Sequence, residues 1–416
     1  MRRILIVDDD PAVTNYLKVF MMQTGLFETT VVNDSREVGR LLDEKTFDII
    51  LLDMDMPNVN GMDILTEMRR KRIDTPVVVL TGVSDVDLAV KAMKLGAFDY
   101  LTKPADEEKL LGVIDQAIEH RALHRTIEDL PKQLSLADLE HGAAFDDFPT
   151  QDAQMIRLFH QAEKLAASNL SIFIRGEIGT GKEATARAIH KASPRRGGPF
   201  VVVEAGSQAE ESFPAFFFGQ ARNWSGSREE APGILEQANG GTLFLNQVDA
   251  LSLPVQMRLL RAIQTNEFYR ESSTQILKAD VRIIVASTKD LTRPECKQTF
   301  LRDLLYHLMI NSLYVPPLRE RLADLPLMAE KFLAEEARKL GRTITGFSGE
   351  FLAFLKDYSF PGNVQELRTI VAAAAANAEG GLVTLDSLPS YIRETIEQEK
   401  AAPREELDRL TDEDLD

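Results

Sequence analysis

A loop of the form Gly-x-x-x-x-Gly-Lys lies within the stretch Ser171–His190. The apolar run Ile172-Phe173-Ile174 predicts a buried strand before the loop, and Glu183–His190 has helical spacing after it. The loop residues are Gly176, Glu177, Ile178, Gly179, Thr180, Gly181, Lys182 and Glu183. Backbone N–H groups of such a loop surround phosphate oxygens, and its lysine reaches the terminal phosphates. Because strand, loop, lysine and helix stand in register, we prefer a nucleotide-binding site to a chance glycine-rich turn.

A second strand near this loop ends in two amides. Glu183 follows Lys182 where Ser or Thr would offer a hydroxyl to Mg²⁺, so the metal needs acidic groups from another strand. The apolar run Thr242–Leu245 is the candidate strand, but it continues into Asn246 and Gln247. An Asp-Glu pair at that point would hold the metal and polarise the attacking water, whereas two amides do neither well.

Three carboxylates are predicted to meet in the first 122 residues. Apolar strands alternate there with helical patterns, at Ile4–Val7, Thr29–Val32, Phe47–Leu52, Pro76–Leu80 and Tyr100–Thr102. This alternation predicts a doubly wound parallel sheet with its functional residues at the carboxyl ends of the strands. Asp8, Asp9 and Asp53 stand at such ends, and converging carboxylates repel one another unless they hold a cation such as Mg²⁺. Thr81 and Lys103, which end two further strands, suit a phosphoryl group.

Residues 1–122 resemble the receiver domains of two-component response regulators. The resemblance implies that Asp53 accepts a phosphoryl group from a sensor histidine kinase. It implies that Mg²⁺ is held by Asp8, Asp9, Asp53 and the backbone carbonyl of Asp55. Thr81 and Lys103 would bind the phosphoryl oxygens, and Tyr100 would be the aromatic switch residue that turns inward. The alternative is a receiver fold with an inactive pocket, but every required residue type is present at the required strand end.

Composition and length set wider bounds. The chain has 416 residues, enough for two or three domains, and its 44% hydrophobic and 27% charged residues are those of a globular protein. The net charge of -17 argues against a surface that coats nucleic acid. Cys296 is the one cysteine, so no internal disulfide can form. No signal peptide or membrane-length apolar run is apparent, and we expect a cytoplasmic protein.

Residues 145–390 resemble the AAA+ core of sigma-54 activators, the bacterial enhancer-binding proteins. The nucleotide loop, the following Ala186–Arg195, the Gly240–Leu245 strand and the segments Val315–Arg321 and Phe360–Val364 carry the likeness. Three amphipathic stretches match the family's small helical lid, at Leu325–Leu340, Gly349–Tyr358 and Val364–Ala378. We therefore expect an α/β protein in which a flavodoxin-like receiver with a five-stranded parallel sheet precedes a AAA+ P-loop domain and its lid.

The sequence departs from this family at the positions that perform hydrolysis. The replaced positions are the Walker B acids (Asn246, Gln247), the γ-phosphate sensor (Glu204), the arginine fingers (Leu301, His307, with Arg302 one place off) and the lid arginine (Gln365). The loop that should touch sigma-54 lacks its threonine in Gln220–Ser227. An arginine finger alone contributes about 10³–10⁵ in rate. The departures predict a pseudo-ATPase that still binds ATP through the retained loop.

The expected domains are a receiver (1–122), a connector helix and linker (123–144), a AAA+ α/β subdomain (145–321), a helical lid (322–390) and an acidic tail (391–416). The helix that ends the receiver, Glu107–Ile127, runs into the connector, and the polar, acidic and Pro-containing stretch Asp129–Thr150 after it is interpreted as linker. The 27 residues after Pro389 lack the apolar content of a helix-turn-helix domain, so we expect no direct DNA binding.

The first functional hypothesis is a response regulator that controls a non-hydrolysing AAA+ module acting through protein contacts. An active sigma-54 activator ATPase without its own DNA-binding domain is the alternative, and a pure phosphate sink is the third. The expected partners are a sensor histidine kinase and a second copy or a AAA+ relative, with sigma-54 RNA polymerase as a further candidate and no membrane. The expected cofactors are Mg²⁺ in the receiver and ATP in the AAA+ module.

Overall fold

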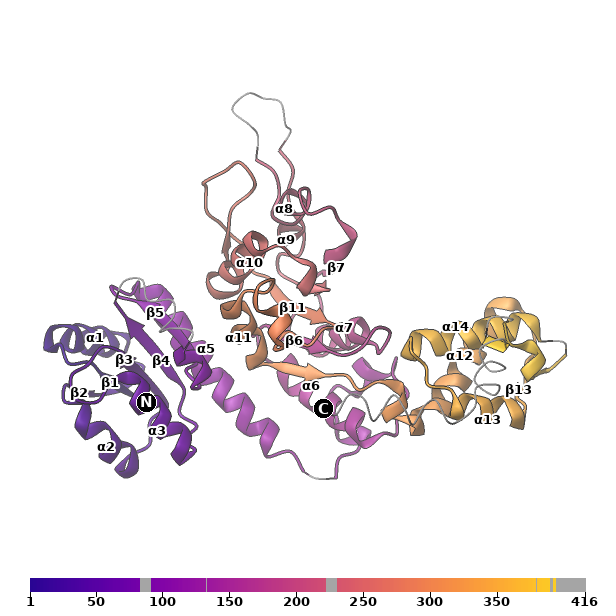
Figure 1. Ribbon diagram of the computed structural model, residues 1–416, viewed down its shortest axis with the longest axis horizontal. Helices are drawn as coiled ribbons and strands as arrows, with labels where there is room; N and C mark the ends of the chain where they lie inside the picture. The colour runs from indigo at the N-terminus through magenta and orange to yellow at the C-terminus, as the bar shows by residue number, and fades with distance from the viewer. Residues whose placement is uncertain (83–90, 132, 222–229, 379, 390–391, 394–416) are drawn as a thin grey trace, which may run out of the picture.

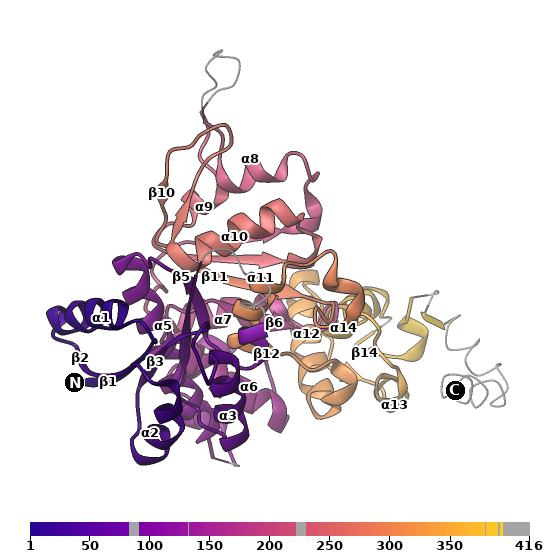
Figure 2. The same cartoon turned by 60° about the vertical axis from the view of Figure 1, so that its left-hand side comes forward.

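The computed structural model describes residues 1–82, 91–131, 133–221, 230–378, 380–389 and 392–393. Two α/β domains and a helical lid follow one another along the chain, as Figure 1 shows from indigo through orange to yellow. Turning the molecule shows the N-terminal domain beside the base of the central domain, with the lid on the other side (Figure 2). Among the described residues, no helix is long and apolar enough to cross a membrane.

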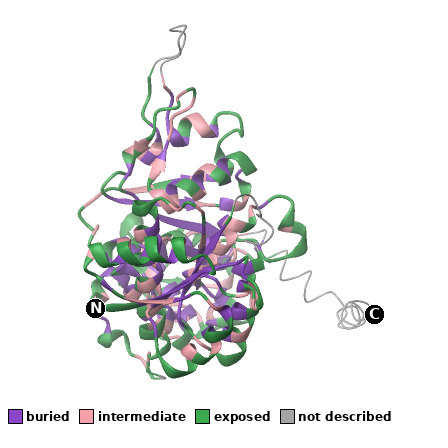
Figure 3. Cartoon of the chain, turned by 90° about the vertical axis from the view of Figure 1, so that its left-hand side faces the viewer, coloured by how far each residue is buried: buried purple, intermediate pink, exposed green. Residues whose placement is uncertain are grey.

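The N-terminal domain is built on a parallel sheet in the order β2-β1-β3-β4-β5. Its strands are β1 (Arg2–Val7), β2 (Phe27–Val32), β3 (Ile49–Asp53), β4 (Val77–Thr81) and β5 (Asp99–Thr102). Its described helices are α1 (Pro11–Thr24), α2 (Val38–Glu44), α3 (Gly61–Lys71) and α5 (Glu107–Glu128). The inner strands are apolar on both faces because helices cover both sides, which Figure 3 shows as purple strands inside green helices. The predicted fold of this domain is confirmed.

Helix α5 extends beyond the sheet and reaches the central domain. The Asp106 side chain caps its first turn by accepting a hydrogen bond from the backbone N–H of Lys109. Arg121 and Arg125 on its second half both form ion pairs with Asp74 and so fix the helix to its own sheet. The helix therefore carries side chains of the receiver to the next domain.

The segment after α5 packs against the central domain, which the linker prediction did not anticipate. Leu139, Phe145 and Phe148 are buried in the same hydrophobic cluster as α6 (Ala153–Ala166) and α7 (Lys182–Ala192). The composition of this segment did not indicate packing, because the three apolar residues stand among polar and acidic ones. The segment is thus a structural part of the central domain.

The central domain has a second parallel sheet, in the order β12-β6-β11-β8-β7. Its strands are β6 (Ile172–Arg175), β7 (Phe200–Glu204), β8 (Thr242–Asn246), β11 (Arg282–Ser287) and β12 (Ser312–Tyr314). The remaining helices are α8 (Phe213–Phe218), α9 (Ile234–Gln237), α10 (Leu253–Thr265) and α11 (Arg302–Ile310), with a short antiparallel pair β9 (Glu267–Phe268) and β10 (Leu277–Lys278). Strand β6 leads directly into the nucleotide loop and α7, as the sequence predicted.

The lid is a separate helical cluster. It contains α12 (Leu325–Leu340), α13 (Gly349–Asp357) and α14 (Asn363–Asn377), with the short pair β13 (Gly346–Phe347) and β14 (Leu382–Val383). Apolar faces of these helices form one buried core that includes Phe332, Phe351 and Leu367. The expected α/β module with a helical lid is confirmed. The acidic tail lies almost entirely outside the described residues, and the proposed domain bounds remain predictions.

Candidate functional sites

Three carboxylates meet at the carboxyl edge of the first sheet. One carboxylate oxygen from each of Asp8, Asp9 and Asp53 lies within 4.8 Å of the others. Asp8 and Asp53 are 1% and 4% exposed, whereas Asp9 faces solvent. The Lys103 ammonium lies 2.5 Å from Asp8 Oδ2 and 2.7 Å from Asp53 Oδ1. Clustered oxygen donors of this kind fit a hard divalent cation such as Mg²⁺.

Burial and charge adjust the groups in this acidic site. Burial raises the pKa of the Asp53 carboxyl above its ordinary value, and the hydrogen bond from Lys103 offsets only part of this effect. Burial lowers the pKa of Lys103, but its hydrogen bonds to Asp53 and Asp8 outweigh that effect and leave the pKa raised. Lys103 therefore stays a cation beside the carboxylates of Asp53 and Asp8.

The other predicted receiver residues surround this site differently. Thr81 is 7% exposed at the end of β4, and its hydroxyl donates to the carbonyl of Gly82 at 3.2 Å. Asp55 is exposed and does not belong to the three clustered carboxylates, which suits a contribution through its backbone only. Tyr100 is half-buried and its hydroxyl donates to Asp303 Oδ2 of α11 at 3.1 Å. The predicted switch residue thus lies between the two domains.

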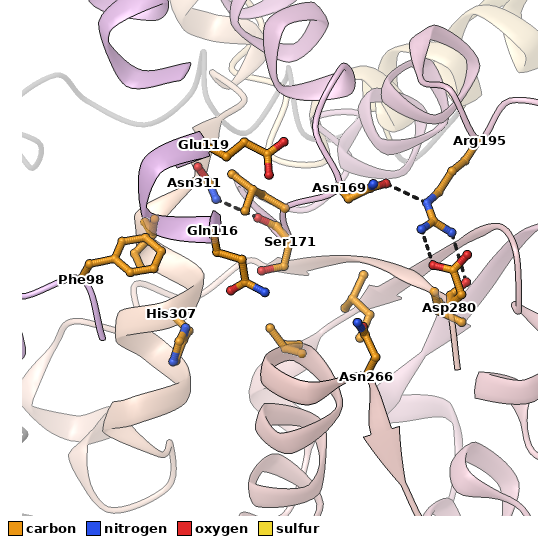
Figure 4. A pocket seen from close by; sticks show the side chains of 15 residues that line it. Phe98, Gln116, Glu119, Asn169, Ser171, Arg195, Asn266, Asp280, His307 and Asn311 are labelled. Carbon is orange, nitrogen blue, oxygen red and sulfur yellow. Dashed lines mark hydrogen bonds and ion pairs between the residues drawn. The ribbon is translucent and has the colours of Figure 1, made fainter. Parts of the chain in front are cut away.

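Further contacts of this interface surround α11. His307 Nε2 lies 3.4 Å from Asp99 Oδ1, and the rings of His120 and His124 both approach the carbonyl oxygen of Ile310. A cavity lies beside these contacts, and Figure 4 shows Phe98, Gln116 and Glu119 of the first domain on one side of it. Burial lowers the pKa of His120 to about 4, with the neighbouring His124 charge acting in the same direction.

The arginine-finger positions lie outside the nucleotide cavity. Leu301 occupies the position before the first turn of α11 without a side-chain capping bond, and its backbone N–H donates to Gln256 Oε1 at 2.7 Å. His307 is buried against the first domain, where sequence alone had assigned it only the place of a missing finger. In this protein the position has a contact role between domains.

The nucleotide loop borders a cavity between the central domain and the lid. Gly179, Gly181, Lys182 and Glu183 line it. A Cβ on Gly179 would lie 2.1 Å from the carbonyl oxygen of Gly362, and its φ of +74° favours glycine. The remaining lining residues include Glu204, Asn246, Gln365 and Arg368. The loop thus faces both the end of the second sheet and α14.

Lys182 is held inside the loop. Its ammonium donates to the carbonyl oxygens of Gly176 and Glu177 at 2.9 and 2.7 Å, and the residue is 7% exposed. Burial lowers its pKa to about 8. A phosphate group in the cavity would stabilise the ammonium form.

The lid and the segment before it hold the loop from outside. Arg319 forms two hydrogen bonds with Glu177, of 2.7 and 2.6 Å, which lower the pKa of that carboxyl to about 2. Asn363 donates to Glu177 Oε2 and to the carbonyl of Ile178. Buried Arg321 donates to the carbonyl of Thr180 at 2.8 Å. The loop is therefore bound directly to the first residue of α14 and to the segment before the lid.

The ends of β7 and β8 carry the substituted positions. The Asn246 amide donates to both carboxylate oxygens of Glu204, at 2.9 and 3.0 Å. Gln247 is exposed, with a φ of +57°, and its side chain lies against Gly206 rather than in the cavity. Of the two amides, Asn246 therefore lines the nucleotide cavity, whereas Gln247 lies outside it.

Sequence reasoning missed several residues of the cavity. Asp147 and Phe148 reach it from the packed segment, Arg187 from α7, and Lys331 and Arg368 from the lid. The Phe148 ring would lie 3.0 Å from a Cβ on Gly181. An aromatic residue in an acidic stretch was the available signal. The family's lid arginine was expected at the position of Gln365. Arg368, one helical turn further on, supplies a cation from the lid instead.

Family descriptions match most of the chain. The sigma-54 interaction domain matches residues 148–314, the response regulator receiver domain residues 4–115, and the AAA+ ATPase lid domain residues 319–405. The regulatory protein AtoC of Escherichia coli is 34% identical over 397 residues, which cover 95% of this chain and 85% of AtoC. The DNA-binding transcriptional regulator NtrC of Salmonella typhimurium is 34% identical over 390 residues, covering 94% and 81%.

Solved structures agree with these relatives. A crystal structure of NtrX from Brucella abortus in complex with ATP has a TM-score of 0.55 and 30% identity, covering 95% of this chain and 85% of that one. The chain therefore belongs to the NtrC-type family of two-component response regulators, which join a receiver to a sigma-54 interaction domain and a AAA+ lid. The predicted family is confirmed.

The prediction that the central module is not an enzyme is contradicted. The sigma-54 interaction domain and the NtrC-type relatives indicate an active AAA+ ATPase. The substitutions at Asn246, Gln247, Leu301, His307 and Gln365 had suggested otherwise because, taken together, they depart from the family at several groups of one mechanism. The departure of the sigma-54 contact loop was predicted in Gln220–Ser227, and from residue 222 on this stretch lies outside the described residues.

Proposed function

We propose that this response regulator accepts a phosphoryl group on Asp53 from a sensor histidine kinase and thereby controls ATP turnover by its AAA+ module. The observation that carries the proposal is the placement of Tyr100, which lies on the edge strand β5 of the receiver, three residues before Lys103 of the acidic site, and whose hydroxyl donates to Asp303 of α11. This contact between the receiver and the central domain supports the proposal, because it lets a change at one domain act on the other.

The chemistry of the receiver follows from its side chains. A carboxylate oxygen of Asp53 attacks the phosphorus of the kinase phosphohistidine, and the bond from phosphorus to the histidine nitrogen breaks. Asp8, Asp9 and Asp53 would hold Mg²⁺, which when bound supplies charge neutralisation for the transferring group. Lys103 already contacts Asp53 and can pair with a phosphoryl oxygen, and the Thr81 hydroxyl is a further donor.

ATP is the nucleotide we assign to the second site. The relative NtrX was crystallised with ATP, and the loop, Lys182 and the lid cation Arg368 border one cavity in this chain. Backbone N–H groups at the start of α7 and the Lys182 ammonium supply the positive potential that a triphosphate requires. The AAA+ module then acts on sigma-54 RNA polymerase. Self-association of the chain assembles the active form of this module.

Phosphoryl transfer is tested by mass measurement. The full-length protein is incubated with acetyl phosphate and Mg²⁺, and the intact mass is recorded beside Asp53→Asn and the matched control Asp55→Asn. We expect one added phosphoryl group in the wild type and the control, since Asp55 contributes only its backbone, and none in Asp53→Asn. Labelling of Asp53→Asn equal to that of the wild type would contradict the assignment.

A further inference from the structure

Four carboxylates line the nucleotide cavity, and one of them lacks a cationic partner among the described residues. Asp147 is paired with Lys191, Glu183 with Arg187, and Glu335 with Arg368. Glu204 accepts side-chain hydrogen bonds only from the neutral amide of Asn246 in the described part of the chain. The amide therefore fixes the orientation of the Glu204 carboxylate but does not neutralise its charge.

The position of Glu204 is set by strand register. It ends β7 directly beside Asn246, which ends β8, and the pair stands at the carboxyl edge of the sheet from which the nucleotide loop also departs. The Glu204 charge acts on buried Lys182 and favours its ammonium form. Because Glu204 and Lys182 line the same cavity, the carboxylate can act in the same reaction as the lysine that reaches terminal phosphates.

The side-chain carbonyl oxygen of Asn246 is available to a ligand. Its Oδ1 atom is buried and has no hydrogen-bond partner among the described residues, while its Nδ2 is committed to Glu204. A buried carbonyl oxygen without a donor is costly unless a ligand or water satisfies it. A water molecule donating to this oxygen would lie next to the Glu204 carboxylate.

We propose that Glu204 is the carboxylate that orients and deprotonates the water attacking the γ-phosphate, and that Asn246 positions it. This inference rests on the proposed ATPase activity. The water oxygen forms a bond to the γ-phosphorus as the bond to the β,γ-bridging oxygen breaks, which yields ADP and inorganic phosphate. The water proton passes to Glu204 and then to solvent. The family resemblance placed acids at Asn246 and Gln247 and an amide at Glu204, so within the register pair Glu204–Asn246 the acid and the amide have exchanged strands.

The exchange suggests a double variant. Glu204→Asn with Asn246→Asp keeps one carboxylate and one amide across the same strand pair and reverses their order. If the pair acts as a unit, this variant retains a water-orienting acid, whereas Glu204→Gln removes the charge and keeps the shape.

The test measures ATP turnover and binding of a non-hydrolysable ATP analogue with the full-length phosphorylated protein. Glu210→Gln is the matched control, because Glu210 is exposed six residues further on and does not line the cavity. We expect Glu204→Gln to lower kcat by about 10²-fold or more, with analogue Kd unchanged within about threefold, as for loss of a general base. The double variant should recover turnover to within about tenfold of the wild type.

Each outcome decides a separate point. A Glu204→Gln variant with wild-type kcat would overturn this inference and leave the proposed ATPase function intact. A wild type without turnover would overturn both. If Glu204→Gln fails to bind the analogue, the double variant decides: analogue binding with kcat as low as background contradicts the exchange.

Discussion

The hydroxyl of Tyr100 donates a 3.1 Å hydrogen bond to the carboxylate of Asp303, across 203 residues of sequence and between two domains. The other oxygen of Asp303 is buried without a partner in the described part of the chain. Burial raises the pKa of the Tyr100 hydroxyl well above its ordinary value, and the negative charge of Asp303 adds to this effect. A movement of Tyr100 toward its own domain would leave Asp303 unsatisfied, so the contact opposes that movement.

Removal of this contact should uncouple the domains. We expect Tyr100→Phe to reduce the difference in ATP turnover between the phosphorylated and unphosphorylated states, and to weaken domain docking by about 1 kcal/mol. Asp303→Asn should act on the same coupling, and a double-mutant cycle should show that the two changes are not additive.

The control for this prediction is Tyr16→Phe. Tyr16 also donates a hydrogen bond to a carboxylate, that of Glu107, but within the receiver. An equal loss of coupling in Tyr16→Phe would show that the effect is not specific to the interface.

Lys182 predicts a pH dependence of nucleotide binding. Its pKa of about 8 lies below the ordinary value of 10.5, so the ammonium is complete only below about pH 7. Since phosphate oxygens favour the ammonium, ATP affinity should be constant below that pH and weaken by up to about tenfold per unit above pH 8. Titration calorimetry with Lys182→Met, which should bind weakly and without this dependence, checks the cause. A pH-independent Kd in the wild type would refute it.

His120 predicts acid sensitivity of the interface. Its folded pKa of about 4 lies below the ordinary 6.5, so the neutral ring is favoured in the folded protein. The stability that this group contributes is complete above pH 6.5 and is lost as the pH falls toward 4. Urea unfolding of the full chain between pH 6.5 and 5 should show decreasing stability, with a smaller decrease in His120→Asn. Identical slopes for the two proteins would contradict the assignment to this ring.

The close approach of Gly179 to the lid predicts that a side chain at this position is not tolerated. Alanine at this position would adopt an unfavourable φ and place its Cβ against the carbonyl of Gly362. We expect Gly179→Ala to weaken ATP binding by at least about tenfold, because the change costs more than 1 kcal/mol at a site of backbone strain. Gly197→Ala, where the added Cβ meets open space, is the control. Unchanged Kd in Gly179→Ala would show that the loop does not need this contact.

Both sheets could be predicted because buried parallel strands are apolar runs whose polar residues gather at one end. Asp53 was singled out in this way because it directly follows such a run, and Lys182 because the loop that carries it begins just after another. The packed segment was missed because Phe145 and Phe148 stand among acids, and their burial depends on α6 and α7. The Tyr100–Asp303 contact links residues too far apart in sequence for any local pattern to indicate.

The prediction of lost hydrolysis was wrong because each residue was compared with the family's residue at the same aligned position, and five such departures were taken together as a loss of the mechanism. The replacement of an expected asparagine by Glu204 was visible in the sequence. Its side-by-side register with Asn246 was not, because the connection between β7 and β8 is long and a one-residue shift would separate the pair. An exchange of a carboxylate and an amide between neighbouring strand ends can be recognised only when that register is known.

The most direct test of the account is the ATP turnover of the full-length protein measured before and after phosphorylation with acetyl phosphate, beside Asp53→Asn under the same conditions. The account predicts turnover that rises on phosphorylation of the wild type and does not respond in Asp53→Asn. A wild-type rate that is the same in both states, at a verified stoichiometry of phosphorylation, would contradict control of the AAA+ module through Asp53.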